Sequence, residues 1–234
     1  MLNFNRFEIL TFDCYGTLIN WEDGILDCLH KILAANNKHV DEAEMLRLYG
    51  EFEASAEQGK YRPYREVLQS VVQQFGDELG FSPSTAEVSS LPESLATWKP
   101  WPDTVAALQQ LRSRFRLAII SNIDDDLFAA TRPKLEVEFD PIVTAQQAKA
   151  YKPSLEIFEL ALSRINVPRD RILHVGQSIY HDVIPAQSLG LATVWVNRPS
   201  PRTGAGAVKA AEGNPDLQVN NLKELADKAE SSTL

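Results

Sequence analysis

The chain has 234 residues, of which 44% are apolar and 24% charged, and its formal net charge is −9. This composition predicts one or two ordinary globular domains and excludes a disordered or fibrous chain. The acidic balance argues against a nucleic-acid partner, because nucleic-acid-binding proteins carry basic patches. No apolar run approaches the roughly 18 residues that a membrane span needs, so no membrane association is expected.

The N-terminal residues and the cysteines indicate the cellular compartment of the protein. Residues 1–6 lack the apolar region of a secretory signal peptide. Two cysteines, Cys14 and Cys28, are too few for a disulfide framework and do not have the spacing of a zinc site. We therefore expect a cytoplasmic protein with reduced thiols.

The chain changes character after its first predicted strand. Residues 6–12 are apolar and β-prone, and they predict a buried strand that ends at Asp13. Residues 21–98 instead place apolar side chains at helical spacing between glycine and proline breakers, with few strand signals. This stretch predicts a small helical domain.

Helices and strands alternate from Trp98 onward. Strands are predicted over residues 117–120, 140–144, 172–175 and 194–196, and helices over 124–135 and around 155–165. Such alternation implies an α/β protein whose parallel sheet is covered by helices on both faces. Ligands of these sheets bind at the carboxyl ends of the strands.

The polar side chains just past the predicted strands should therefore converge on one site. Asp13 could attack an electrophile and form an ester, and Lys152 could hold it ionised. Ser121 and Asn122 could bind an anionic part of the substrate. Asp182 could position Lys152 or assist the water that cleaves the ester.

Four motifs at these positions resemble, in order, those of the haloacid dehalogenase-like superfamily. They are residues 13–18 (Asp-Cys-Tyr-Gly-Thr-Leu), Ser121-Asn122, residues 151–153 (Tyr-Lys-Pro) and residues 176–182. The resemblance covers nearly the whole chain. It implies a Rossmann-like core of residues 1–18 and 99–234, with a helical cap inserted as residues 19–98.

The resemblance also implies roles for individual residues. The implied catalytic residues are Asp13, Thr17, Lys152 and Asp182. The implied substrate-binding residues are Cys14, Tyr15, Trp21, Ser121 and Asn122.

Two departures from the phosphatase motifs indicate which branch of the superfamily the chain resembles. Its phosphatases carry a second aspartate two positions after the nucleophile, where this chain has Tyr15, and a phenol with a pKa of about 10 cannot protonate a leaving group at neutral pH. Gln177 replaces the first of two acids that usually hold magnesium, a cation that prefers charged oxygen ligands. The Asp-x-Tyr-Gly-Thr pattern is similar to that of the type II L-2-haloacid dehalogenases, which use no metal. No cofactor is therefore expected, and magnesium only if the protein is a phosphatase.

The chain also departs from those dehalogenases. Phe158 stands where they have a tyrosine, Gln177 and Ile179 replace a serine and an asparagine near the hydrolytic water, and their cap arginine has no clear match. Several stretches, among them Trp21-Glu22, are similar to a relative that opens the ring of L-azetidine-2-carboxylate.

The leading hypothesis is a hydrolase that acts through an aspartyl ester on a small 2-substituted carboxylate, as a 2-haloacid dehalogenase does. Three alternatives remain open: ring opening of an azetidine-type acid, a magnesium-dependent phosphatase for a small metabolite, and a non-catalytic binding protein on the same scaffold. A small carboxylate is the expected partner, and both a monomer and a homodimer are compatible with the sequence.

Four positions have structural interpretations as well. Asp182 could cap a helix over residues 183–189. Trp21, at the start of the predicted cap, could contact substrate or pack the cap onto the core. His174 and His181 have no metal-site spacing and are expected to be structural.

Overall fold

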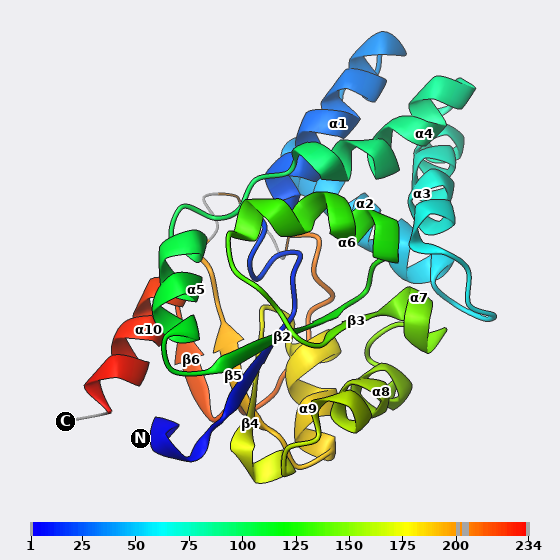
Figure 1. Ribbon diagram of the computed structural model, residues 1–234. Coiled ribbons are helices and arrows are strands. Elements are labelled where there is room, and N and C mark those ends of the chain that lie inside the picture. The colour runs from blue at the N-terminus through cyan, green and yellow to red at the C-terminus, as the bar shows by residue number, and fades with distance from the viewer. Residues whose placement is uncertain (1, 200–201, 203–205, 233–234) are drawn as a thin grey trace.

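The computed structural model describes residues 2–199, 202 and 206–232 (Figure 1). Six strands form one sheet in the order β3-β2-β1-β4-β5-β6, and all neighbouring pairs are parallel. The strands are β1 (Ile9–Phe12), β2 (Arg116–Ser121), β3 (Ile142–Thr144), β4 (Ile172–Gly176), β5 (Ala192–Val196) and β6 (Leu217–Val219). The strand order reverses between β1 and β4, and ligands of doubly wound sheets bind outside the strand ends at this point.

Helices cover both faces of the sheet, as expected for parallel strands buried on each side. Successive residues of β1 point to opposite faces of the sheet. Leu10 and Phe12 belong to the apolar cluster that includes α5 and α10, whereas Ile9 belongs to the cluster that includes α8 and α9. The helices that follow β1 and the insertion are α5 (Thr104–Arg112), α6 (Asp125–Thr131), α7 (Ala145–Ala148), α8 (Leu155–Ile165), α9 (Ile184–Ser188) and α10 (Leu222–Ser231). This arrangement confirms the predicted α/β class.

Four helices are inserted between β1 and α5, and they pack on one another above the carboxyl edge of the sheet (Figure 1). They are α1 (Trp21–Ala35), α2 (Glu42–Ala56), α3 (Tyr64–Leu79) and α4 (Thr85–Ser94). Short turns complete the order: η1 (Phe4–Arg6), η2 (Leu95–Thr97), η3 (Arg132–Leu135), η4 (Arg169–Arg171) and a π-helical turn, η5 (Ile179–Val183). None of the helices in the described ranges has the length and apolar character that crossing a membrane requires.

A carboxylate from the loop after β2 anchors the inserted helices. Asp124, only 3% exposed, accepts hydrogen bonds from the backbone N–H groups of Tyr64 and Arg65, at 3.0 and 2.9 Å. These groups lie in the first turn of α3, whose own N-cap residue, Pro63, supplies no side-chain bond. Asp124 therefore caps a helix of the insertion from the sheet side.

The two chain segments that connect the insertion to the sheet lie side by side. Ile19 pairs with Pro100, and the backbone N–H of Asn20 donates to the carbonyl of Lys99 at 2.9 Å. The insertion thus leaves and rejoins the sheet domain at one place.

The expected elements differ from the observed ones mainly at their ends. The first strand begins at Ile9 rather than at residue 6, because the preceding residues form the turn η1, capped by Asn3. The helix expected over residues 124–135 is α6 followed by η3, since Pro133 has no N–H for a continuing helix. The strand β6 and the helix α10 were not predicted.

Candidate active site

A buried lysine lies at the centre of the strand-end residues. Lys152 Nζ is 2.8 Å from Asp13 Oδ1 and 2.7 Å from Asp182 Oδ1, and it donates to the carbonyl of Ile120 at 3.0 Å. Lys152 is 2% exposed, Asp182 1% and Asp13 8%. Asp13 follows β1 and Asp182 follows β4, so the reversal of strand order brings the two carboxylates to one ammonium.

The contacts among Lys152, Asp13 and Asp182 shift the pKa of each group. Burial by itself would lower the pKa of Lys152, but Asp13 and Asp182 together raise it above its usual value. Burial opposes ionisation of Asp182 as well, yet Lys152 and His174 hold its pKa well below the usual range. Burial raises the pKa of Asp13, and Lys152 counteracts that shift.

A threonine orients the second oxygen of Asp13. The Thr17 hydroxyl donates to Asp13 Oδ2 at 2.7 Å and accepts from the backbone N–H of Gln177 at 2.9 Å. Both oxygens of Asp13 are therefore held. The turn favours Gly16, because its φ of +94° is a backbone conformation that other residues rarely adopt.

Asn122 supports Lys152 rather than reaching toward a ligand with its amide. Its Oδ1 accepts from the Lys152 backbone N–H at 2.7 Å, and its Nδ2 donates to the Lys152 carbonyl at 3.1 Å. Asn122 lines the cavity beside Asp13, but both ends of its amide are occupied. Its geometry is that of a positioning residue.

The cavity above Asp13 measures about 60 Å³ and contains two buried donors without a partner. They are Ser121 Oγ and Trp21 Nε1, which form no hydrogen bond within the described part of the chain. Trp21 is 9% exposed and also packs edge-on against Tyr49 of α2, with ring centroids 5.9 Å apart. Trp21 thus both packs the insertion and lines the cavity.

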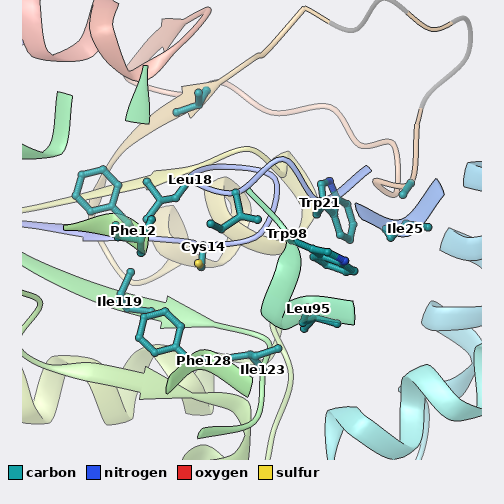
Figure 2. Close-up of a cluster of buried hydrophobic side chains, with 14 of the residues drawn as sticks. Phe12, Cys14, Leu18, Trp21, Ile25, Leu95, Trp98, Ile119, Ile123 and Phe128 are labelled. Carbon is teal, nitrogen blue, oxygen red and sulfur yellow. The ribbon is translucent and has the colours of Figure 1, made fainter. Parts of the chain in front are cut away.

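Tyr15 and Cys14 point in different directions. Tyr15 lines the cavity, and its hydroxyl is 2.9 Å from the hydroxyl of Thr131 on α6. The Cys14 side chain is fully buried among apolar side chains such as Phe12 and Ile119, as Figure 2 shows. Burial raises the pKa of the Cys14 thiol well above its usual value. The structure therefore does not bring the Cys14 side chain to the cavity, contrary to the substrate contact expected from the sequence, because odd and even positions after β1 face opposite ways.

The wall opposite Asp13 is formed by α2 and the start of α3. Glu53 accepts hydrogen bonds from Tyr49, at 2.9 Å, and from Tyr64. Glu57, one helical turn further on, also lines the cavity, and its carboxylate forms no hydrogen bond or ion pair with a described residue. Burial raises the pKa of Glu53, and burial together with Glu53 raises that of Glu57 well above its usual value.

The structure corrects the helix-cap alternative for Asp182. Asp182 lies inside the turn η5, and Ser178 caps that turn by accepting from the His181 N–H at 3.0 Å. His174 is buried between the Thr11 hydroxyl, at 2.8 Å, and Asp182, at 3.3 Å. His181 lines the cavity, which its sequence context did not indicate, and burial lowers its pKa to about 4.

The residues at the site do not fit a magnesium ion. Within the described ranges, no group of three histidine, cysteine, aspartate or glutamate side chains could hold a metal. The Lys152 ammonium already lies between Asp13 and Asp182, and Tyr15 and Gln177, which also line the cavity, supply no carboxylate. No step is therefore assigned to a metal.

Sequence reasoning missed Glu53 and Glu57. A signal for them was present, because Leu46, Tyr49, Glu53 and Glu57 recur at spacings of three or four residues. The apolar face of α2 is therefore continued by two half-buried carboxylates, Glu53 within the helix and Glu57 as its C-cap residue. A wider chamber of about 410 Å³ adjoins the cavity and shares Glu53, Glu57, Lys152 and His181 with it.

Comparison with known proteins defines the class. A model of the haloacid dehalogenase-like hydrolases matches residues 7–190, and the chain belongs to this family of enzymes. It is 26% identical over 231 residues to the (S)-2-haloacid dehalogenase H-109 of Pseudomonas putida, covering 94% of this chain and 96% of the relative.

Two further proteins extend the comparison. The haloacetate dehalogenase H-2 of Moraxella sp. (strain B) is 26% identical over 196 residues, covering 82% of this chain and 87% of the relative. The L-2-haloacid dehalogenase structure from Xanthobacter autotrophicus superposes with a TM-score of 0.80 at 18% identity, over 96% of this chain and 98% of that chain. This structural likeness shows that the fold is shared.

Proposed function

We propose that this hydrolase displaces the substituent at C2 of a small 2-substituted carboxylate through an ester of Asp13, with 2-haloacids as the substrates of first choice. One observation carries the proposal. Asp13, the candidate nucleophile, is held by Lys152 and Thr17 at the base of a small cavity that also contains the unpartnered donors of Ser121 and Trp21. The named relatives, a 2-haloacid and a haloacetate dehalogenase, support the same chemistry.

The reaction has two steps. An oxygen of Asp13 attacks C2, the bond from C2 to the substituent breaks, and the substituent leaves with the electron pair, which inverts C2. Ser121 and Trp21 hold the substrate carboxylate during the attack. Water then attacks Cγ of the ester, which restores Asp13 and releases the 2-hydroxy acid.

The second step needs a group that accepts a proton from water. Asp182 is engaged with Lys152, His174 and the Ser178 N–H, and in this proposal it positions Lys152. His181 is uncharged at neutral pH because its pKa is lowered to about 4, and it lines the cavity. We assign to His181 the role of accepting a proton from the attacking water.

The proposal also includes the division into cap and core, the cellular compartment and the oligomeric state. Residues 19–98 act as a cap over a core of residues 1–18 and 99–234, which shields the ester from uncontrolled hydrolysis. The two free cysteines, Cys14 and Cys28, fit a reducing cytoplasm. A monomer or a homodimer without nucleic acid is compatible with this reaction, and sedimentation of the purified protein distinguishes the two states.

The test is a substrate panel of 2-haloacids, L-azetidine-2-carboxylate and phosphate esters, each with and without EDTA. We expect halide release that EDTA does not affect. After rapid acid quenching, we also expect a peptide containing Asp13 whose mass is raised by the ester. Ring opening alone would favour the azetidine alternative. A strict magnesium requirement with turnover of phosphate esters would contradict the proposal and place the chain among the phosphatases.

A further inference from the structure

The charges around the cavity are poorly matched to a substrate that is only an anion. Four carboxyl groups line it: Asp13, Asp182, Glu53 and Glu57. Among the described lining residues Lys152 is the one cation, and Asp13 and Asp182 already share its ammonium. A bare carboxylate substrate would add a negative charge, and a departing halide would keep that charge beside the glutamates.

The two glutamates lie close together on the wall formed by α2. They are one helical turn apart, a spacing at which like charges repel. The Tyr49 and Tyr64 hydroxyls hold the Glu53 carboxylate, whereas that of Glu57 has no partner in the described structure. Lys149 and Lys209 line the wider chamber but not this cavity. They lie over the rings of Tyr61 and Tyr180 and form no ion pair with a described residue.

The unpartnered donors in the same cavity provide the second, independent observation. Trp21 Nε1 and Ser121 Oγ belong to side chains at least nine-tenths buried, and both donors lack a hydrogen-bond acceptor in the described structure. Buried polar groups of this kind normally have a partner. Here the ligand itself can supply an acceptor for them, such as a carboxylate oxygen.

We infer that the substrate is a zwitterion: a small 2-substituted carboxylate that also carries a protonated amine. Its carboxylate is bound by Trp21 and Ser121, and its ammonium is bound by Glu53 and Glu57. The inference rests on the proposed function and narrows its substrate class. A single substrate of this kind gives each unmatched group of the cavity a partner of opposite character.

A matched pair of substrates tests the inference. 3-Amino-2-chloropropionate and 2-chlorobutanoate have the same leaving group and nearly the same shape, but an ammonium in the first replaces a methyl group in the second. The kcat/KM for the amine should exceed that for the alkyl acid by about tenfold or more, measured as chloride release above the rate without enzyme. In Glu57→Gln this ratio should fall toward one.

A control on the same helix separates charge from fold. Glu51→Gln removes an exposed carboxylate that pairs with Arg47 at 2.5 Å, and it should leave the substrate ratio unchanged. If Glu57→Gln slows both substrates equally, or if the wild-type ratio is near one, the inference is wrong even though the proposed function stands.

A binding experiment judges the inference independently of turnover. β-Alanine and butyrate lack a leaving group and differ by the same exchange of ammonium for methyl. Calorimetry with Asp13→Asn should show β-alanine binding about tenfold more tightly, and Glu57→Gln in that background should abolish the difference. Equal binding, or tighter binding of butyrate, overturns the inference. Absence of chloride release and of any Asp13 ester from every 2-haloacid contradicts the proposed function instead.

Discussion

The two sides of the cavity differ in how their polar groups are satisfied. On the sheet side, defined by Asp13, Thr17, Lys152 and Asp182, each charged group faces an opposite charge or a donor within 2.7–2.8 Å. On the helical side, the Trp21 donor and the Glu57 carboxylate have no hydrogen-bond partner among the described residues. Ser121, at the end of β2, is the exception on the sheet side, because its hydroxyl also lacks such a partner.

The contrast separates chemistry from recognition. A nucleophile must have its final geometry before the substrate arrives, because reorganisation during the reaction would raise the barrier. Groups that recognise the substrate become satisfied only when it binds. Variants on the sheet side should therefore abolish turnover, whereas variants on the helical side should alter affinity and selectivity.

The largest effect is expected from Asp13→Asn. The amide is nearly isosteric but a poor nucleophile, so kcat should fall by about three orders of magnitude or more while the fold persists. Single-turnover kinetics on fresh protein, with deamidation excluded by mass spectrometry, measures this. Substantial residual activity would falsify the covalent mechanism.

Lys152→Ala should be nearly inactive and also less stable. It leaves Asp13 and Asp182 as buried carboxylates without their cation, and removal of one partner of such a buried network costs about 3–5 kcal/mol. Urea unfolding and kcat are measured together. Lys152→Arg keeps the charge, yet its larger planar guanidinium should also give poor activity. Robust turnover by the alanine variant would show that the sheet side does not need its ammonium.

Trp21→Phe tests the helical side. It keeps a ring against Tyr49 and removes the N–H, so KM should rise by about tenfold, the equivalent of about 1.4 kcal/mol, with little change in kcat. Trp21→Ala would combine this loss with a packing defect, which the melting temperature reports. An unchanged KM in a folded Trp21→Phe protein would mean that the indole only packs the insertion onto the core.

The smallest effect is on the pH dependence of stability. Burial lowers the pKa of His181 from 6.5 to about 4, so its contribution to stability is complete above pH 6.5 and is lost as the pH falls toward 4. The pKa of Glu57 is raised above 4.5, so its contribution is complete below that pH and is lost as the pH rises through the raised value.

Each group changes the slope by at most about 1.4 kcal/mol per pH unit. In urea unfolding from pH 4 to 9, His181→Gln should show a flatter profile between pH 4 and 6.5. Glu57→Gln should lose the decline in stability that begins above pH 4.5. Identical profiles for wild type and both variants would mean that neither group differs in proton affinity between the folded and unfolded chains.

The family and the sheet-side residues could be inferred from sequence because they depend on local order along the chain. Asp13 and Ser121 directly follow apolar strands, and parallel strands end at one edge of a sheet. The helical insertion was equally visible, since its apolar side chains recur at helical spacing. The short strand β6 escaped prediction because three residues carry too little periodicity.

Only the tertiary structure decided which groups share a partner. Three such contacts leave no local pattern in the sequence. Lys152 bridges Asp13 and Asp182, Asn122 holds the Lys152 backbone, and Cys14 turns into the core. The same holds for the helical side, because helical spacing places Glu53 and Glu57 on one face of α2 but does not say what that face covers. Burial and electrostatic pairing arise only when segments distant in sequence pack together, and these two properties determine what the cavity binds.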